Sequence, residues 1–160
     1  MKLSNFQKIL LISISVVVFL AYMDFTGFHM FQLVGGWETE AYTKLSPAYL
    51  QMFWTFAYAL IIAIDLVYYQ LKKDKSETVA LLLIPLTLIW FGLEDVIYYI
   101  MMGIPIMGAE MPWLYGSKCM GGLAKLLGLE TVTGFSLLLS LGIGFLISYY
   151  LYKWLKRAKW

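Results

Sequence analysis

The chain alternates long runs of apolar residues with shorter polar segments. Four runs are about 20 residues or longer, which matches the ~30 Å hydrocarbon core of a bilayer at 1.5 Å of helical rise per residue. Transmembrane strands are not expected, because the runs lack alternation of apolar and polar positions. The sequence therefore predicts four membrane-spanning helices, at residues 9–28, 49–71, 79–102 and 129–152.

Composition agrees with a membrane protein. Of the 160 residues, 61% are hydrophobic and only 14% are charged, whereas soluble domains carry about 25% charged residues. This length leaves room for one domain. We therefore expect an all-α integral membrane protein, in which residues 1–160 form a single antiparallel bundle of four transmembrane helices.

The basic residues are divided unequally between the two sides of the predicted bundle. Nine of the twelve lysines and arginines lie near the termini or in the connection 72–77, and three lie in the two longer loops. Cytoplasmic segments carry such an excess, so both termini are expected in the cytoplasm of a multi-pass cell-membrane protein. The two outer loops contain short apolar segments suited to the membrane interface. Membrane lipids are the expected partners, and nucleic acid is not, since no basic stripe with interleaved aromatics is present.

Acidic residues inside the spans are the strongest functional signal. An ionised aspartate at the centre of a membrane helix costs about 2.5–3.5 kcal/mol on insertion scales. Because the helices alternate in direction, one set of acids falls in the outer half of the membrane, with the one histidine on the same side. We expect this set to form an outward-facing pocket that binds or moves a cation or a proton, with the ligands Asp24, Glu94, Asp95, Glu130 and His29.

The adjacent acids Glu94 and Asp95 are the centre of this prediction. Neighbouring residues on a helix point about 100° apart, so at least one of the two faces other helices. No lysine or arginine lies in any span at that depth, so protonation, a bound metal ion or a water-filled cavity must compensate the charge. Carboxylates suit Mg²⁺, Ca²⁺ or Mn²⁺, and His29 widens the choice to iron or zinc. A divalent metal ion is therefore a candidate cofactor.

Aromatic and polar side chains supply a predicted lining for the pocket. Aromatic residues stand four positions before and after each acid of the pair, which is one helical turn. On the second span, polar residues fall within about 80° of arc, an arrangement that suits either a wet face or interhelical hydrogen bonds. The predicted lining residues are Trp90, Phe91, Tyr98, Tyr99, Tyr58 and Asp65.

A second interpretation is acid catalysis within the membrane. A buried acid beside aromatic rings can protonate a polyene, and the ring faces stabilise the resulting cation. The stretch 92–99 is similar to the acidic–aromatic motif of membrane lycopene cyclases, over less than a tenth of the chain. The motif has a proline where this chain has Gly92, and it ends in a glutamine that this chain lacks. The resemblance implies an enzyme acting on a lipid or isoprenoid, with Glu94 and Asp95 as the candidate catalytic acids.

Small residues recur every four positions along the last span, and such ridges let membrane helices approach closely. The ridge consists of Ser136, Ser140, Gly144 and Ser148. Gly144 is expected to face another helix at short range. A third interpretation follows: a non-catalytic accessory subunit, or a bundle that forms a homo-oligomer or a larger membrane complex along this ridge. On the third span, Pro85 predicts a local kink.

Overall fold

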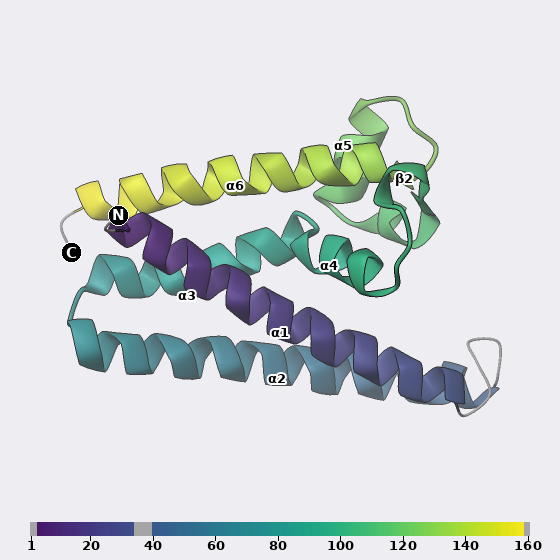
Figure 1. Ribbon diagram of the computed structural model, residues 1–160, viewed down its shortest axis with the longest axis horizontal. Coiled ribbons are helices and arrows are strands. Elements are labelled where there is room, and N and C mark those ends of the chain that lie inside the picture. Colours follow the sequence, from purple (N-terminus) through teal and green to yellow (C-terminus); the bar gives the residue numbers. More distant parts are fainter. Residues whose placement is uncertain (1–2, 34–39, 159–160) are drawn as a thin grey trace.

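The computed structural model describes residues 3–33 and 40–158, and the side chains of residues 28–46 lie outside that description. The protein is mostly helical, and its four long helices run alternately in opposite directions (Figure 1). These are α1 (Asn5–Leu33), α2 (Glu40–Lys72), α3 (Lys75–Trp90) and α6 (Gly134–Arg157). The shorter elements are α4 (Leu93–Met101), η1 (Ile106–Gly108), β1 (Glu110–Met111), η2 (Pro112–Gly116), α5 (Met120–Leu126) and β2 (Val132–Thr133).

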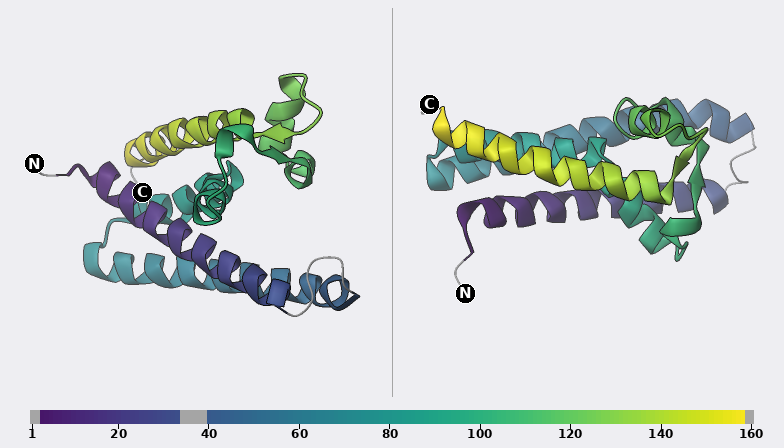
Figure 2. Two further views of the ribbon diagram at one scale, coloured as in Figure 1. Left: turned by 45° about the vertical axis from the view of Figure 1, so that its right-hand side comes forward. Right: turned by 90° about the horizontal axis from the view of Figure 1, so that it is seen from above.

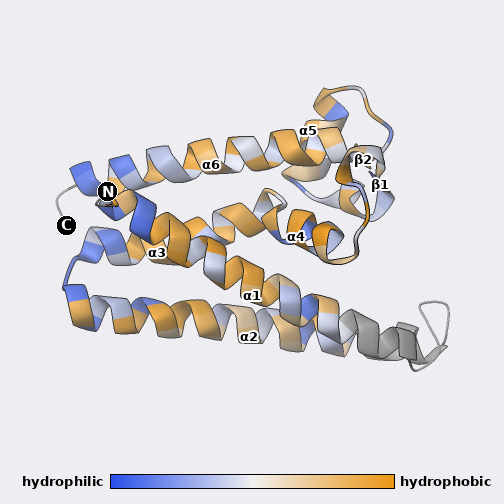
Figure 3. Ribbon diagram, in the orientation of Figure 1, coloured by the Kyte–Doolittle hydropathy of each residue, from blue (hydrophilic) through white to orange (hydrophobic). Residues whose placement is uncertain are grey.

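Three to four segments of the described chain are long and apolar enough to cross a membrane. Three are single helices: Asn5–Gly27 of α1, Pro47–Lys72 of α2, and all of α6. The bent pair α3 and α4 passes the same test when taken as one span. Figure 3 shows apolar residues along the middle of the helices and hydrophilic ones near the end that carries both termini. This pattern is typical of a membrane protein.

Helix α3 lies at the centre of the molecule and packs against α1, α2 and α6 (Figures 1 and 2). By contrast, only 17% of the most apolar stretch of α2 is buried, so α2 is the most exposed of the long helices. The termini end carries both termini and the α2–α3 connection, and the loop end carries α4, α5 and the two strands (Figure 1).

The third predicted span is broken into two helices. Helices α3 and α4 meet at an angle of 60°. Gly92 sits at the break with a φ of 95°, in the left-handed region that favours glycine. The last turn of α3 is closed by two backbone hydrogen bonds. The N–H of Phe91 donates to the carbonyl of Thr87, and the N–H of Gly92 donates to the carbonyl of Ile89. The predicted kink site is corrected accordingly, because α3 continues through Pro85 and the change of direction comes at Gly92.

Helix α6 begins at Gly134, later than the predicted residue 129. The Thr133 hydroxyl accepts from the Ser136 backbone N–H at 3.3 Å, and the Ser136 hydroxyl accepts from the Thr133 N–H at 3.0 Å. This capping box begins the helix. Just before it, Val132 and Thr133 pair antiparallel with β1. Glu130 therefore lies in a bend ahead of β2, and its predicted place in the first turn of a helix is wrong.

Candidate functional site: an acidic cluster at the loop end

Three of the predicted acids lie near one another on α1 and α4. Glu94 is within electrostatic range of Asp24 and of Asp95, and Asp95 is also within range of Asp24. All three are partly buried. The break at Gly92 turns α4 so that it contacts α1, and the first turn of α4 carries both Glu94 and Asp95. These three residues are called the acidic cluster.

Tyr49 of α2 completes this cluster. Its hydroxyl donates a hydrogen bond to Asp24 Oδ1 at 3.0 Å and lies 3.3 Å from the Asp24 carbonyl oxygen. It is also within electrostatic range of Glu94. A Cβ at Gly27 would overlap the Tyr49 ring, so the glycine permits this approach. Tyr49 is one of twelve tyrosines and was not among the predicted site residues. The available signal in the sequence was Gly27, almost one turn after Asp24.

The acidic cluster has no basic partner among the described side chains. The ion pairs recorded for those residues are made by Lys156, at the termini end. The first turn of α4 offers partial compensation, since the N-terminus of a helix is the positive end of its dipole. Ionised carboxylates at membrane depth are costly without further compensation.

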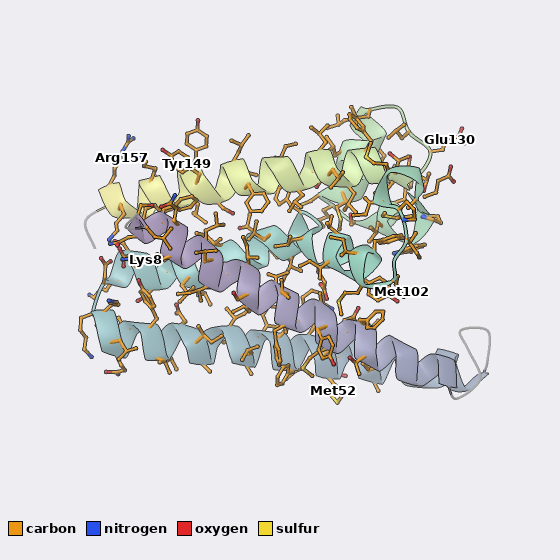
Figure 4. The ribbon with its side chains drawn as sticks, viewed as in Figure 1. Lys8, Met52, Met102, Glu130, Tyr149 and Arg157 are labelled. Atoms are coloured by element: carbon orange, nitrogen blue, oxygen red, sulfur yellow. The ribbon has the colours of Figure 1, made fainter. Side chains whose placement is uncertain are left out.

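The other two predicted ligands are not brought into this cluster by the described structure. Glu130 is exposed, and its side chain points outward at the loop end (Figure 4). The side chain of His29 lies outside the described residues, although its backbone belongs to α1. Among the described side chains, no three from histidine, cysteine, aspartate and glutamate are grouped to hold a metal ion. A divalent metal site stays a prediction that requires a ligand from elsewhere.

Two of the predicted lining residues border the acidic cluster. The ring of Tyr98 packs against Phe25 of α1, with centroids 5.8 Å apart, and it neighbours the ring of Tyr99 at 6.4 Å. Tyr99 is buried and stacks on Trp113 of η2 at 6.4 Å with an interplanar angle of 6°. Trp113 thus connects η2 to α4, the helix that carries Glu94 and Asp95.

Other predicted lining residues lie away from the acids. Trp90, expected inside, is 59% exposed at the end of α3, directly before the break. Tyr58 is exposed on α2. Asp65 is half-buried farther toward the termini end, and its buried Oδ1 atom has no hydrogen-bond partner among the described residues. Phe91 packs against Gly144 of α6.

The ridge of small residues on α6 is buried within the protein. Ser136, Ser140 and Ser148 have no exposed surface. A Cβ at Gly144 would lie 2.6 Å from the Cβ of Phe91, so the two segments are in close contact. This side of α6 therefore packs against α3 and against the break between α3 and α4. It is not free for oligomerisation, contrary to that part of the third interpretation.

An apolar groove lies between α1 and α2, farther toward the termini end than Asp24 and Tyr49. Its volume is about 520 Å³, and it is open on one side. It is lined by Leu11, Ile12, Ser15, Val16, Phe19, Leu60 and Ile64. The groove contains no acid, so it does not coincide with the acidic cluster. Its surface suits an acyl chain of the surrounding lipid.

A second polar network, centred on Glu77, lies at the termini end. Glu77 is 3% exposed, accepts from Asn5 Nδ2 and from the Tyr68 hydroxyl at 2.8 Å each, and pairs with Lys156 Nζ at 3.0 Å. Its backbone N–H donates to Asp74, the N-cap of α3. Glu77 was predicted to lie in a loop, although the spacing of Asp74 and Glu77 fits a helix start.

Asp74, in the connection before α3, also pairs with Lys156. Partial burial opposes its ionisation, but the hydrogen bonds from Lys156 and from the Glu77 backbone outweigh that effect. They hold the pKa of Asp74 below its usual range. The ionised form of Asp74 is therefore part of the folded arrangement.

Comparison of the chain with protein-family models, with curated proteins and with solved structures finds no match.

Proposed function

We propose that the protein is a polytopic membrane protein whose acidic cluster binds a cation or a proton and exchanges it with the side of the membrane that faces the loop end. The observation that supports this most is the approach of Asp24 to Glu94 and Asp95 from separate membrane helices. Three carboxyl groups without a basic partner among the described residues have a high affinity for positive charge. Tyr49 adds a hydroxyl that can donate to a carboxylate or coordinate an ion through its oxygen.

The break between α3 and α4 supports the same proposal. Transporters bind ions where membrane helices are interrupted, because free backbone groups and helix ends are accessible there. In this protein Gly92 interrupts the helix directly ahead of Glu94 and Asp95. We further propose that α3 and α4 together form one of four antiparallel spans, with both termini cytoplasmic. The excess of lysine and arginine at the termini end supports this orientation.

The test uses purified protein in two measurements. Calorimetry in detergent measures the binding of Na⁺, Mg²⁺ and Ca²⁺, and liposomes containing a pH-sensitive dye report proton entry under an imposed membrane potential. We expect the parent protein to bind one of these ions or to admit protons. Asp24→Asn, Glu94→Gln and Asp95→Asn each remove one charge with little change in shape, so each should reduce that signal at least about tenfold, as a loss of about 1.4 kcal/mol does.

Glu130→Gln is the matched control. It removes the charge of an acid that the sequence groups with the others but that the structure places in an exposed bend. The parent signal should survive this change. The proposal fails if the parent protein neither binds these cations nor admits protons, or if a triple Asp24→Asn, Glu94→Gln, Asp95→Asn variant retains the full signal.

Acid catalysis on a lipid or isoprenoid is a second candidate, favoured by the rings beside the acidic cluster. Phe25 and Tyr98 pack together next to the acids, and Tyr49 stacks near Phe53 at 6.3 Å. Such ring faces stabilise a carbocation after protonation of a double bond. Mass spectrometry of lipids extracted from membranes with parent protein or with the Glu94→Gln variant tests this candidate. A product that depends on Glu94 supports it, and identical lipid profiles contradict it.

A further inference from the structure

The outward face of α6 carries a pocket of aromatic and basic side chains at the termini end. Its volume is about 390 Å³, within the range of about 300–1,000 Å³ that is typical of small-molecule sites. The side chains of Tyr149 and Arg157 point to the same side of α6, away from the other helices (Figure 4). This feature is called the α6 pocket, and it is lined by Tyr149, Tyr150, Lys153, Trp154 and Arg157, all exposed.

The two cations of the α6 pocket have no carboxylate partner among the described side chains. Asp74 and Glu77, the acids before and at the start of α3, both pair with Lys156. Lys156 is thereby neutralised, whereas the described part of the chain records no ion pair for Lys153 or for Arg157. These two residues stand four positions apart, which is one helical turn. The pocket therefore presents two neighbouring positive charges to a ligand.

Ring contacts hold part of the α6 pocket in place without a ligand. Phe6 of α1 packs edge-to-face against Tyr149, with ring centroids 5.4 Å apart. The Tyr150 ring meets the same ring at 5.6 Å, and Lys153 Nζ lies 5.4 Å from its centroid. A cation–π contact thus orients the ammonium group. Such ordering reduces the entropy that is lost when the side chain binds an anion.

The position of the pocket along α6 indicates which anion it meets. Gly134–Arg157 is a candidate membrane span, and the pocket occupies its last turns. Tyrosine and tryptophan rings gather at the level of the lipid headgroups. Leu139 and Leu146 stand on the same helical face as Lys153, by the 3.6-residue period, and both are exposed. This face changes from apolar to basic toward the termini end, as a phospholipid changes from acyl chain to phosphate.

We propose that the α6 pocket binds the headgroup of an anionic phospholipid, whose acyl chain lies along the apolar part of the same face. The Arg157 guanidinium donates to the phosphate through two N–H groups. Lys153 supplies the second charge, and the indole N–H of Trp154 is a further donor. A zwitterionic lipid has the same phosphate, but its own ammonium group is repelled by these cations. The proposal is independent of the acidic cluster, which lies toward the opposite end of the helices.

Native mass spectrometry of the purified protein in uncharged detergent tests the proposal. Phosphatidylglycerol and phosphatidylcholine with identical acyl chains are added in equal amounts, and the bound lipids are counted. The parent protein should retain phosphatidylglycerol at least about tenfold more than phosphatidylcholine. Lys153→Gln and Arg157→Gln should each lower this preference about fivefold, the effect of one cation near an anionic membrane surface. The double variant should bind the two lipids equally.

A charge-matched variant separates the pocket from the general charge of this end. Lys72→Gln combined with Lys75→Gln removes two exposed lysines from the termini end, outside the pocket. This control should keep the preference of the parent protein, and so should Lys153→Arg, which keeps the charge.

Three results would overturn the proposal. The first is a parent protein without a preference, and the second is a control that loses as much preference as the double pocket variant. The third is displacement of phosphatidylglycerol by an equal concentration of glycerol phosphate, because the pocket would then bind a free phosphate. Melting in detergent without added lipid checks the fold, and it should be equal for the parent and the pocket variants, since the replaced side chains are exposed.

Discussion

Glu77 is the residue through which all four long helices are connected at the termini end. Asn5 reaches it from α1, Tyr68 from α2 and Lys156 from α6, while Glu77 itself belongs to α3. A buried carboxylate is tolerated only when its oxygens are hydrogen-bonded and its charge is paired, and here both conditions are met. This network also closes the termini end with polar contacts, opposite the acidic cluster.

Replacing Glu77 with alanine should destabilise the protein by about 3 kcal/mol. Three polar contacts are lost, each contributing about 1 kcal/mol net, and the donors of Asn5 and Tyr68 are left without their acceptor. Thermal unfolding in detergent measures the effect. Lys75→Ala is the control in the same helical turn, because Lys75 is exposed, and it should change stability by less than about 0.5 kcal/mol. Equal melting of the Glu77→Ala variant and the parent would show that the network is not stabilising.

The lowered pKa of Asp74 predicts that the protein loses a small amount of folding stability in acid. Its pKa is lowered in the folded state, so its contribution is complete above the ordinary carboxyl pKa of about 4 and is lost as the pH falls through the lower folded value. The pair with Lys156 is about one-third exposed, so we expect only a few tenths of a kcal/mol. The stability difference between the parent and Asp74→Asn, measured from pH 6 downward, should shrink in acid; a constant difference would contradict this assignment.

At the scale of elements, the contact of α6 with the break between α3 and α4 positions the acidic cluster. Gly144 allows Phe91 to approach the backbone of α6, and Gly92 follows directly with its positive φ. A Cβ at Gly92 would in addition meet Leu137 of α6 and the sulfur of Met120. The orientation of α4, and with it that of Glu94 and Asp95, therefore depends on the absence of side chains at two positions.

Gly144→Leu should overpack this contact and cost about 1–3 kcal/mol. Gly142→Leu is a matched control on the same helix, since a Cβ at Gly142 meets no atom within 4 Å. Melting in detergent should fall for the first variant and change little for the second. A Phe91→Ala substitution added to Gly144→Leu should recover part of the loss by making room. Equal melting temperatures of the two leucine variants would indicate that Gly144 faces lipid and does not contact Phe91.

At the scale of the molecule, the loop end forms a folded layer over α4 and α6. Trp113 stacks on Tyr99, β1 pairs with β2, and the Gly134 backbone N–H donates to the carbonyl of Ala109 at 3.0 Å. These contacts hold the segment between α4 and α6 to the helices.

Labelling of single cysteines tests the proposed orientation. Gly108 at the loop end and Ala158 at the termini end are both exposed, and each is replaced by cysteine in a Cys119→Ser background. A membrane-impermeant maleimide applied to intact cells should react with the cysteine at position 108 and not with that at 158, because lysine and arginine concentrate at the cytoplasmic side. The reverse pattern would mean that the protein has the opposite orientation in the membrane. Labelling after permeabilisation with detergent serves as the control for the reactivity of both cysteines.

The apolar runs alone predicted the helices and a membrane environment, because a bilayer demands segments of set length whose backbone hydrogen bonds are internal. The acids inside those runs marked Asp24, Glu94 and Asp95 for the same reason, since charge at that depth needs compensation. The tertiary structure alone placed Tyr49 at the acidic cluster, Glu77 among four helices and Trp90 on the outside. It also moved the helix break to Gly92 and the start of α6 to Gly134. These features depend on how each helix is rotated and crossed against its neighbours, and the periodicity of a single span does not contain that information.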